Sequence, residues 1–383
     1  MGDACENCHQ SAFQSVENKA CVQCHSNVED HLDVAHVEAD LNEEDCAYCH
    51  KEHQGQNNII RQDEASCIDC HEDIKDFDVN SKLADVGEFG ESHPNFKVSL
   101  LVPAKNQDPL QQGFDWSVIR TDISSGNLKE NNFLKFSHKD HLTKEGVENE
   151  TGAKEFMQCS SCHQPQLDGG IMKPIAMEQH CSRCHRMEFD PNNPNRQIPH
   201  GEPKLVILTL KEYYSRQLLE GLTDATNRTQ GKRQIRRPGA SPKKTKNQSQ
   251  KEFALEWALQ QTEKIAADLI ERKACVSCHQ VSVDESQPLA KRWAIKPVKI
   301  IQQWYPKSQF SHRRHETMRC VDCHDAVESE LSENILMPDI NNCRDCHGSK
   351  DDDSKVSSSC VLCHGFHGKN EASKINQEIQ WKP

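Results

Sequence analysis

The sequence repeats one five-residue pattern, Cys-x-x-Cys-His, ten times, and the ten copies use all 20 cysteines of the chain. Residues i, i+3 and i+4 lie on one face of a helical turn. Two thiols on that face can form thioethers with the two vinyl groups of one porphyrin, and the imidazole beside them can reach its iron. This spacing is typical of c-type haem attachment. The sequence therefore predicts ten covalently attached haem c groups, each with its iron.

The predicted attachment residues are, in chain order, Cys5, Cys8 and His9; Cys21, Cys24 and His25; Cys46, Cys49 and His50; Cys67, Cys70 and His71; Cys159, Cys162 and His163; Cys181, Cys184 and His185; Cys275, Cys278 and His279; Cys320, Cys323 and His324; Cys343, Cys346 and His347; and Cys360, Cys363 and His364. Paired cysteines also bind zinc, but a zinc site needs no histidine directly after the second cysteine. A disulfide framework would leave the same histidine unexplained.

The composition is too polar for an ordinary hydrophobic core. Hydrophobic residues make up 35% of the chain, aromatic residues 5%, and the mean hydropathy is −0.83. Such a chain would be suspected of disorder, but ten apolar porphyrins would supply the missing interior. We therefore expect a mostly α-helical and irregular fold with little β structure, in which short helices and loops wrap around covalently bound haems.

Histidines outside the motifs are numerous enough to give each iron a second axial ligand. The chain has 21 histidines, and ten of them belong to the motifs. Imidazole is a common axial ligand of haem iron, and ten further ligands would make every haem bis-histidine, which leaves one histidine over. The candidates are His31, His36, His53, His93, His138, His141, His180, His200, His312, His315 and His367.

The motifs are unevenly spaced and divide the chain into blocks. We expect a four-haem block at 1–80, a haem-free insert at 81–132, a two-haem block at 133–203, a helical insert at 204–274, a second four-haem block at 275–368 and a tail at 369–383. The segment after His93 predicts a small strand pair in the first insert. In the second insert, the apolar spacing predicts a helix at 251–273. Its basic stretch at 223–250 is either a flexible solvated loop or a tether for an acidic partner or anionic lipid.

Two segments of the chain share a longer pattern. Phe136-Ser137-His138 continues to His141 and then to the motif at Cys159, and the same Phe-Ser-His-x-x-His pattern recurs at 310–315 before the motif at Cys320. A second motif follows in each case. This matched order indicates an internal repeat of a two-haem unit.

The repeated pattern resembles the start of the class III cytochromes c, the small tetrahaem and trihaem proteins, over roughly 133–190 and 308–367. The resemblance implies that the first histidine of each pair ligates the haem of the next motif, so that His138 serves the motif at Cys159 and His312 the motif at Cys320. It implies that His141 and His315 ligate later haems. The N-terminal block is similar to larger multihaem chains of bacterial periplasmic and membrane-anchored cytochromes.

The charge of the chain bears on its partners and its compartment. The formal net charge is −13, which argues against nucleic acid and suits redox partners that present a basic face. Haem is attached to thiols outside the cytoplasm, so we expect a periplasmic or other extracytoplasmic protein whose export signal or membrane anchor has been removed. Such an anchor, or a partner subunit, would place the protein in a membrane-associated complex.

The function that these observations favour is electron transfer along a chain of bis-histidine haems, between donor and acceptor proteins that the sequence does not name. We expect a carrier without substrate turnover, because an iron with two imidazoles has no open position. Two alternatives stay open. One is a multihaem reductase or oxidase of a nitrogen or sulfur oxyanion with one open haem, and the other is a component of an outer-membrane electron conduit.

Overall fold

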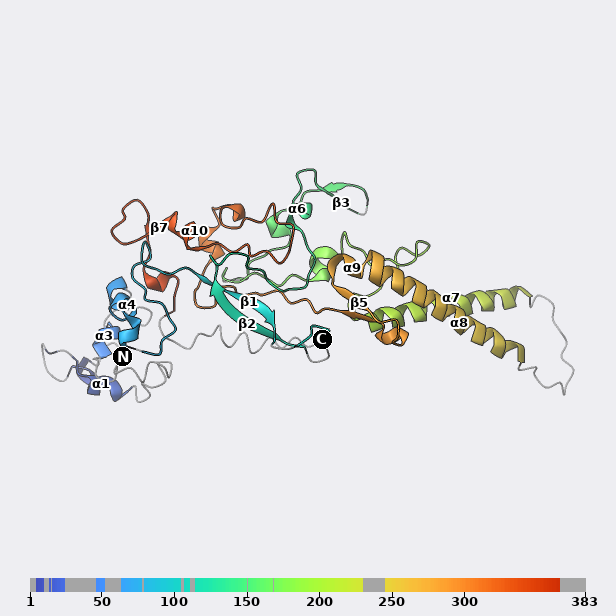
Figure 1. The fold of residues 1–383 in the computed structure, drawn as a ribbon, viewed down its shortest axis with the longest axis horizontal. Coiled ribbons are helices and arrows are strands. Elements are labelled where there is room, and N and C mark those ends of the chain that lie inside the picture. The colour runs from blue at the N-terminus through green and yellow to red at the C-terminus, as the bar shows by residue number, and fades with distance from the viewer. Residues whose placement is uncertain are drawn as a thin grey trace.

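The computed structural model describes residues 5–9, 14, 16–24, 46–51, 63–77, 79–104, 107–110, 114–149, 151–167, 169–229 and 245–365. The protein is about 33% helical and 13% strand. Each of the sheets in the described residues has only two strands, and much of the chain between them is irregular (Figure 1). The expected short helices and coil with little β structure agree with this architecture, although two long helices also occur.

The N-terminal helices are single turns, or a little longer, placed at or beside the motifs. Their bounds are Cys5–Asn7 for η1, Asn18–Val22 for α1, Cys46–Cys49 for α3, Glu64–His71 for α4 and Ile74–Phe77 for α5. Asp63 caps α4, because its carboxylate accepts a hydrogen bond from the backbone N–H of Ser66 at 3.2 Å. The side-chain oxygen of Asn18 accepts from the backbone N–H of Cys46 at 2.8 Å, which ties α1 to α3.

The predicted strand pair of the first insert is present. Strands β1 (Lys97–Pro103) and β2 (Trp116–Asp122) pair in antiparallel register. Strand β1 is buried and β2 is exposed: Val98 and Leu100 of β1 are buried, whereas Val118 and Ile119 of β2 are exposed. The backbone N–H of Ser99 also bonds the carbonyl of Trp304 at 2.8 Å, so β1 lies against the segment that leads into the second repeat.

The two repeats consist of short turns joined by loops. In the first repeat the elements are α6 (His138–His141), β3 (Val147–Glu148), β4 (Lys154–Glu155), η4 (Cys159–Ser161) and η5 (Met177–Cys181). In the second they are η8 (His312–His315), η9 (Cys320–Asp322), α10 (Ile340–Arg344), β7 (His347–Gly348), β8 (Val356–Ser357) and η10 (Cys360–Leu362).

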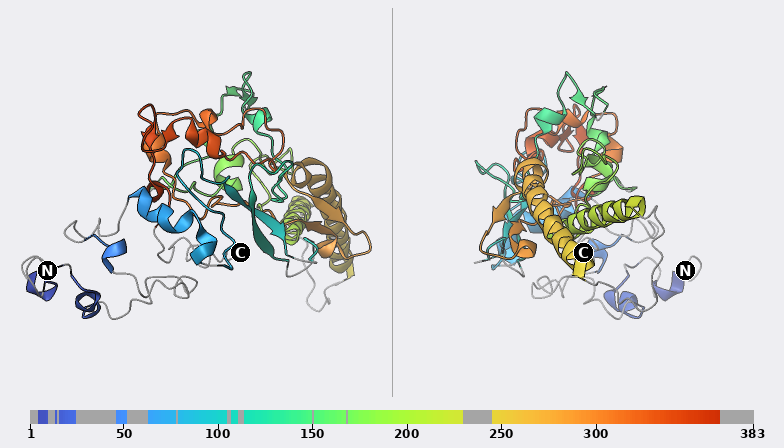
Figure 2. Two further views of the ribbon diagram at one scale, coloured as in Figure 1. Left: turned by 60° about the vertical axis from the view of Figure 1, so that its left-hand side comes forward. Right: turned by 90° about the vertical axis from the view of Figure 1, so that its right-hand side faces the viewer.

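A long helical hairpin separates the two repeats in the chain. Helix α7 (Pro203–Thr229) runs out and α8 (Thr245–Asp268) returns, continues as the π turn η6 (Leu269–Lys273) and reaches α9 (Cys275–Cys278). The strands β5 (Val281–Val283) and β6 (Trp293–Ile295), with the turn η7 (Leu289–Lys291) between them, pack at its base. Figures 1 and 2 show the hairpin at the end of the long axis opposite α1 and α3.

The hairpin corrects one sequence-based boundary. A flexible loop was expected over 223–250, but both ends of that stretch are helical, up to Thr229 and from Thr245. Side chains such as those of Lys, Arg and Gln are good helix formers, so a basic composition does not exclude a helix. The helix predicted at 251–273 is present as the last part of α8 with η6. None of the described helices is long and apolar enough to cross a membrane.

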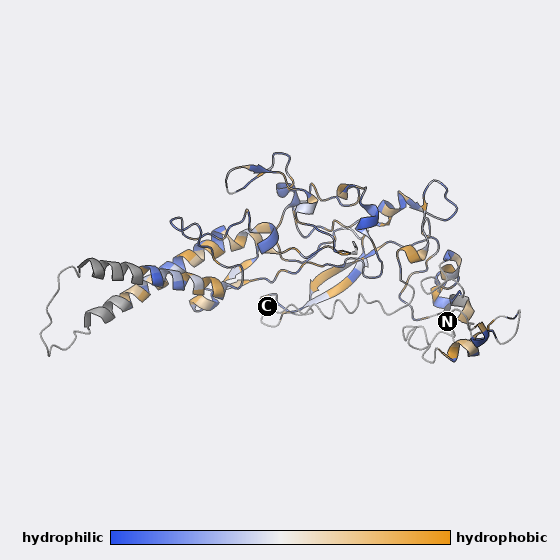
Figure 3. Cartoon of the chain, turned by 180° about the vertical axis from the view of Figure 1, so that it is seen from behind, coloured by the Kyte–Doolittle hydropathy of each residue, from blue (hydrophilic) through white to orange (hydrophobic). Residues whose placement is uncertain are grey.

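The main cluster of buried hydrophobic residues lies at the base of the hairpin. It includes Leu210 from α7, Ala258 from α8, Ile270 from η6, Cys275 and Trp293. Figure 3 shows apolar colour on parts of the hairpin, on the β1–β2 pair and on some of the short helices near the N-terminus. The expectation that haems alone would form the interior is therefore wrong for the hairpin, which has a core of side chains.

Candidate haem-binding sites

The motifs adopt the helical turn that haem attachment needs. In seven of the described motifs the backbone N–H of the histidine donates to the carbonyl of the first cysteine, at 2.8–3.0 Å. These are the motifs that begin at Cys5, Cys46, Cys159, Cys181, Cys275, Cys320 and Cys360. The motif at Cys67 lies in the regular helix α4. Two thiols and an imidazole are thus presented on one side of each turn.

Five motif histidines face a histidine from another part of the chain. The ring centres of the facing pairs are 6.0–6.3 Å apart. The pairs are His93 with His364, His138 with His163, His141 with His185, His200 with His279, and His315 with His347. His312 and His324 are also electrostatic neighbours.

The ring spacing fits one metal ion between each pair of imidazoles. An imidazole nitrogen binds a metal at about 2 Å and its ring centre lies about 1 Å further back, so two imidazoles on opposite sides of one ion have centres about 6 Å apart. The facing pairs have this separation, and each pair contains the histidine of a Cys-x-x-Cys-His turn. The residues therefore fit a haem iron with two histidine ligands and two thioether attachments.

Backbone carbonyls fix the orientation of many of these rings. The Nδ1–H of His141 donates to the carbonyl of Ser137 at 2.7 Å, and that of His315 donates to the carbonyl of Ser311 at 3.0 Å. Four further Nδ1–carbonyl contacts of 2.7–3.1 Å join His93 to Pro94, His312 to Gly169, His324 to Leu336 and His364 to Lys307. A proton on Nδ1 leaves the lone pair of Nε2 free for a metal.

The hydroxyl of Ser358 orients one further ring. It donates to the carbonyl of Val356 at 3.2 Å and lies 2.8 Å from Nδ1 of His347. Because its own proton is engaged, the hydroxyl oxygen accepts from the Nδ1–H of His347. This contact again leaves Nε2 free, on the side that faces His315.

Burial favours the neutral form of these imidazoles. Desolvation is the main cause that lowers the pKa of His93, His138, His163, His185, His279, His312 and His347 below the usual histidine value. Neighbouring histidines lower the pKa of each of these rings further. Only the neutral imidazole binds a metal.

Residues of eight motifs, from the one at Cys46 to the one at Cys360, line one continuous cavity of about 5280 Å³. Its lining includes the turns at Cys67, Cys159, Cys181, Cys320 and Cys343. An ordinary ligand pocket has about 300–1,000 Å³, so this cavity has room for several large ligands. Among the described residues, His, Cys, Asp and Glu form no cluster of three or more suited to a single metal ion. The recurring unit is the facing pair.

Some candidate ligands are not brought into such pairs. His180 lies near His163. Its Nδ1 is 3.0 Å from both the amide nitrogen and the carbonyl oxygen of Ala176. Among the described residues, its ring does not form a facing pair with a motif histidine. His25, His31, His36, His53 and His367 lie outside the described residues. The second ligands of the motifs at Cys5, Cys21, Cys46 and Cys67 thus stay predictions.

The structure adds residues that the sequence did not single out. The carboxylate of Glu178 lies 3.4 Å from Nδ1 of His200, and Gly169 bonds His312 from the other repeat. The Gly169-Gly170 dipeptide is a turn signal, but nothing in the sequence connects it to His312. The pairings of His93 with His364 and of His200 with His279 were likewise unassigned, because these partners are far apart in the chain.

Comparison with known proteins gives one match. Residues 308–365 match the family model described as cytochrome c7 and related cytochrome c. No curated protein and no solved structure matches the chain. The matched segment holds the second Phe-Ser-His-x-x-His pattern and the motifs at Cys320, Cys343 and Cys360, so the match and the facing rings together support a multihaem electron-transfer cytochrome with covalently bound haem c.

Proposed function

We propose that this chain is an extracytoplasmic decahaem c-type cytochrome that passes electrons between redox proteins through bis-histidine haems. The observation that carries the proposal is the set of five facing histidine pairs, each containing a motif histidine, with ring centres 6.0–6.3 Å apart. Haem iron supplies one-electron redox chemistry at each site. The protein supplies the two ligands, the attachment and the surroundings.

Transfer without substrate turnover follows from the ligation. When imidazoles occupy both axial positions, no substrate can bind the iron without displacing one of them. The rings that oppose the motifs are held by neighbouring oxygens, as His141 is by Ser137 and His315 by Ser311. Such restraint opposes ligand loss and favours an iron that changes charge with little movement of its ligands.

The partners and the compartment are part of the same proposal. A net charge of −13 would attract donor or acceptor proteins with a basic face and speed their encounter at low ionic strength. The basic stretch between α7 and α8 would contact an acidic partner or anionic lipid, and would thus hold the protein in a membrane-associated complex. Because haem is coupled to thiols outside the cytoplasm, the protein acts there.

The test is the response of purified holoprotein to external haem ligands. Absorption spectra would be recorded with and without cyanide, carbon monoxide, nitrite and hydroxylamine, and a haem assay would give the number of haems per chain. We expect ten haems and low-spin spectra that ignore all four ligands. The matched control is His141→Ala, which should open one iron and make that protein respond.

A high-spin band in the unaltered protein, or a spectral shift on adding nitrite or hydroxylamine, would favour a reductase or oxidase with an open haem instead. Fewer than ten haems would contradict the proposed count.

A further inference from the structure

The two repeats have the same internal geometry. Phe136 stacks on His141 with ring centres 4.4 Å apart and planes at 25°, and Phe310 stacks on His315 at 4.6 Å and 21°. The second histidine of each pattern then faces the second motif of its repeat. His141 and His185 are 6.1 Å apart at 47°, and the equivalent pair in the other repeat is 6.1 Å apart at 48°.

The equivalence extends to a third motif that the sequence had not joined to the first repeat. The residue before each Phe-Ser-His pattern donates its backbone N–H to the second cysteine of a third motif: Lys135 bonds the carbonyl of Cys278 at 2.8 Å, and Gln309 bonds that of Cys363 at 2.6 Å. The third histidines are also matched, since His279 and His364 each face a histidine from outside the motifs at 6.0 Å.

Each repeat is therefore a unit of three sites. We name unit A the motifs at Cys159, Cys181 and Cys275, and unit B the motifs at Cys320, Cys343 and Cys360. Unit B is continuous and lies within the segment that matches the cytochrome c7 family. Unit A has the same arrangement, but the α7–α8 hairpin is inserted between its second and third motifs. This insertion separates the third motif of unit A from the other two in the sequence.

The units meet through their first motifs. The thiols of Cys159 and Cys320 lie close enough to interact electrostatically. Around this contact, the turn of each unit rests on a loop of the other. In one direction the backbone N–H of Lys139 donates to the carbonyl of Ser329 at 3.0 Å, and in the other His312 donates to Gly169 at 2.8 Å. In the repeated pattern Lys139 corresponds to Arg313, so the two donors occupy adjacent positions. Their reciprocal arrangement indicates an approximate two-fold relation.

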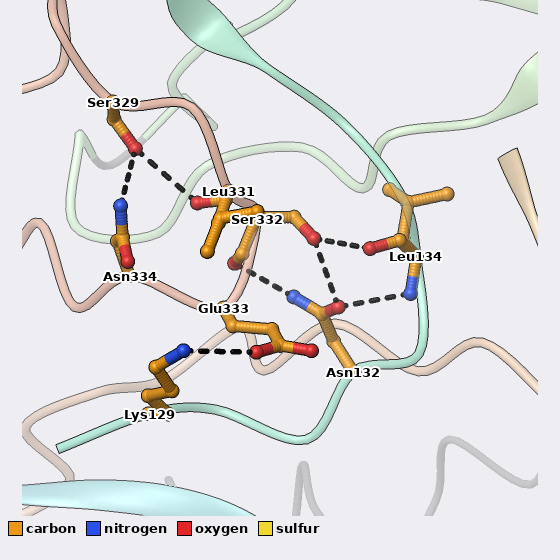
Figure 4. A network of polar contacts seen from close by, with 8 residues as sticks. All are labelled: Lys129, Asn132, Leu134, Ser329, Leu331, Ser332, Glu333 and Asn334. Carbon is orange, nitrogen blue, oxygen red and sulfur yellow. Dashed lines mark hydrogen bonds and ion pairs between the residues drawn. The ribbon is translucent and has the colours of Figure 1, made fainter.

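A polar network strengthens the same junction. The side chain of Asn132 donates to the carbonyl of Ser332 at 2.9 Å and accepts from the backbone N–H of Leu134 at 3.0 Å. The hydroxyl of Ser332 bonds both Asn132 and the carbonyl of Leu134. Figure 4 shows how these residues, with the ion pair of Lys129 and Glu333, join the segment before the first repeat to the loop after Cys320.

Cysteine contacts extend from this junction in both directions. In unit A, Cys181 interacts electrostatically with Cys162 and Cys278. In unit B the equivalent Cys343 interacts with Cys323 and Cys363. The middle site of each unit thus lies between the other two sites. Beyond unit B, the thiols of Cys67 and Cys360 lie close enough to interact electrostatically. Figure 1 shows α9, α10 and α4 in this sequence along the long axis.

We propose that seven haem sites form a single row in the order Cys275, Cys181, Cys159, Cys320, Cys343, Cys360 and Cys67, in which two equivalent three-haem units meet through their first motifs. This inference rests on the proposed function, because it takes the facing histidines as haem ligands. Within this row, electrons cross from one unit to the other between the Cys159 and Cys320 haems. The hairpin lies at the end of the row marked by the Cys275 haem.

Electron paramagnetic resonance of paired variants tests the order. His138→Ala, His200→Ala and His312→Ala each remove the ligand opposite one motif, so each should give one high-spin ferric signal. In the double variant His138→Ala/His312→Ala the two open irons are neighbours in the row. Coupling of their spins should make the high-spin signal clearly smaller than the sum of the signals of the two single variants. In the matched control His200→Ala/His312→Ala two sites separate the open irons, so the signals should add.

The control pair is the closer of the two in sequence, because Cys320 is nearer to Cys275 than to Cys159. Additive signals in the first pair and coupled signals in the second would therefore overturn the row in favour of chain order. Absence of a high-spin signal from the single variants would contradict the proposed ligation itself. Iron-edge anomalous diffraction from the unaltered holoprotein provides a second test, and it would reject the row if the Cys159 iron were closer to the Cys275 iron than to the Cys320 iron.

Discussion

At the scale of single residues, the positions of the ring nitrogens decide which histidines can bind iron. Most of the described distal rings, such as those of His93, His141 and His315, direct Nδ1 at an oxygen that lies nearby in the chain. The acceptor fixes the tautomer and makes Nε2 a stronger donor. Because axial-ligand strength tunes haem potential, these small contacts set potentials that the motif alone does not.

Ser358→Ala tests this effect at the site of Cys343. The change removes the acceptor of the His347 Nδ1–H, so the imidazole becomes a weaker donor and the ferric state is less stabilised. We expect one haem to shift to higher potential in a redox titration while all haems stay low spin. Ser354→Ala is the control, because the hydroxyl of Ser354 bonds the carboxylate of Asp352 and no histidine. An unchanged titration of Ser358→Ala would show that this contact does not tune the haem.

Gly169→Ala tests a position where both the backbone conformation and the neighbouring atoms disfavour a side chain. Gly169 has φ +75°, and an added Cβ would lie 3.0 Å from the Cβ of Arg313. The left-handed conformation alone costs about 1–2 kcal/mol for a residue with a side chain, and the close contact would add to it. Since Gly169 bonds His312, we also expect part of the Cys320 haem to become high spin.

Gly152→Ala separates the cost of the left-handed backbone conformation from the cost of the close contact. Gly152 has the same φ of +75°, but an added Cβ would meet no atom within 4 Å. Chemical denaturation should therefore show a loss of only about 1–2 kcal/mol for this variant, with an unchanged spectrum. Equal losses and equal spectra for the two variants would mean that the contact of Gly169 with the other repeat is unimportant.

At the scale of elements, the features that could be predicted from the sequence are those that depend on residues close together in the chain. The helical turn of each motif, the strand pair that includes β1 and the helix at 251–273 follow from local spacing. The resemblance also placed His141 with a later motif of its block, and the structure puts it opposite His185. The junction between units and the partners of His200 and His93 were not predictable, because they depend on how distant segments pack around large groups that local patterns do not describe.

The helical hairpin is the element that most resembles an ordinary protein, and Leu210→Ala tests its core. Leu210 is fully buried on α7, whereas Leu208 on the same helix is 53% exposed. Emptying a buried leucine site costs about 2–5 kcal/mol, while an exposed change costs less than about 0.5 kcal/mol. We expect chemical denaturation to show this difference between Leu210→Ala and Leu208→Ala. Equal losses of unfolding free energy in the two variants would show that Leu210 is not part of the core of the hairpin.

At the scale of the whole molecule, two kinds of interior coexist. Side chains fill the base of the hairpin, where Cys275 joins the same buried cluster as Trp293. The motifs instead surround the cavity of about 5280 Å³, and ordering each residue of their loops costs about 1–2 kcal/mol of backbone entropy. Without porphyrins to fill that cavity, few apolar contacts offset the cost. The stability of the repeats should thus depend on haem far more than that of the hairpin.

Production in cells that cannot attach haem to thiols tests this division. We expect the colourless chain to lose the cooperative structure of both repeats and to retain at most the helices of the hairpin, because the main side-chain core of the described residues lies at the base of the hairpin. Limited proteolysis with mass spectrometry would show cleavage throughout 133–200 and 308–365 at rates far above those within α7 and α8, while the holoprotein, as control, resists in all these segments. A colourless chain that melted sharply and protected both repeats as well as the hairpin would show that haem is not part of the interior.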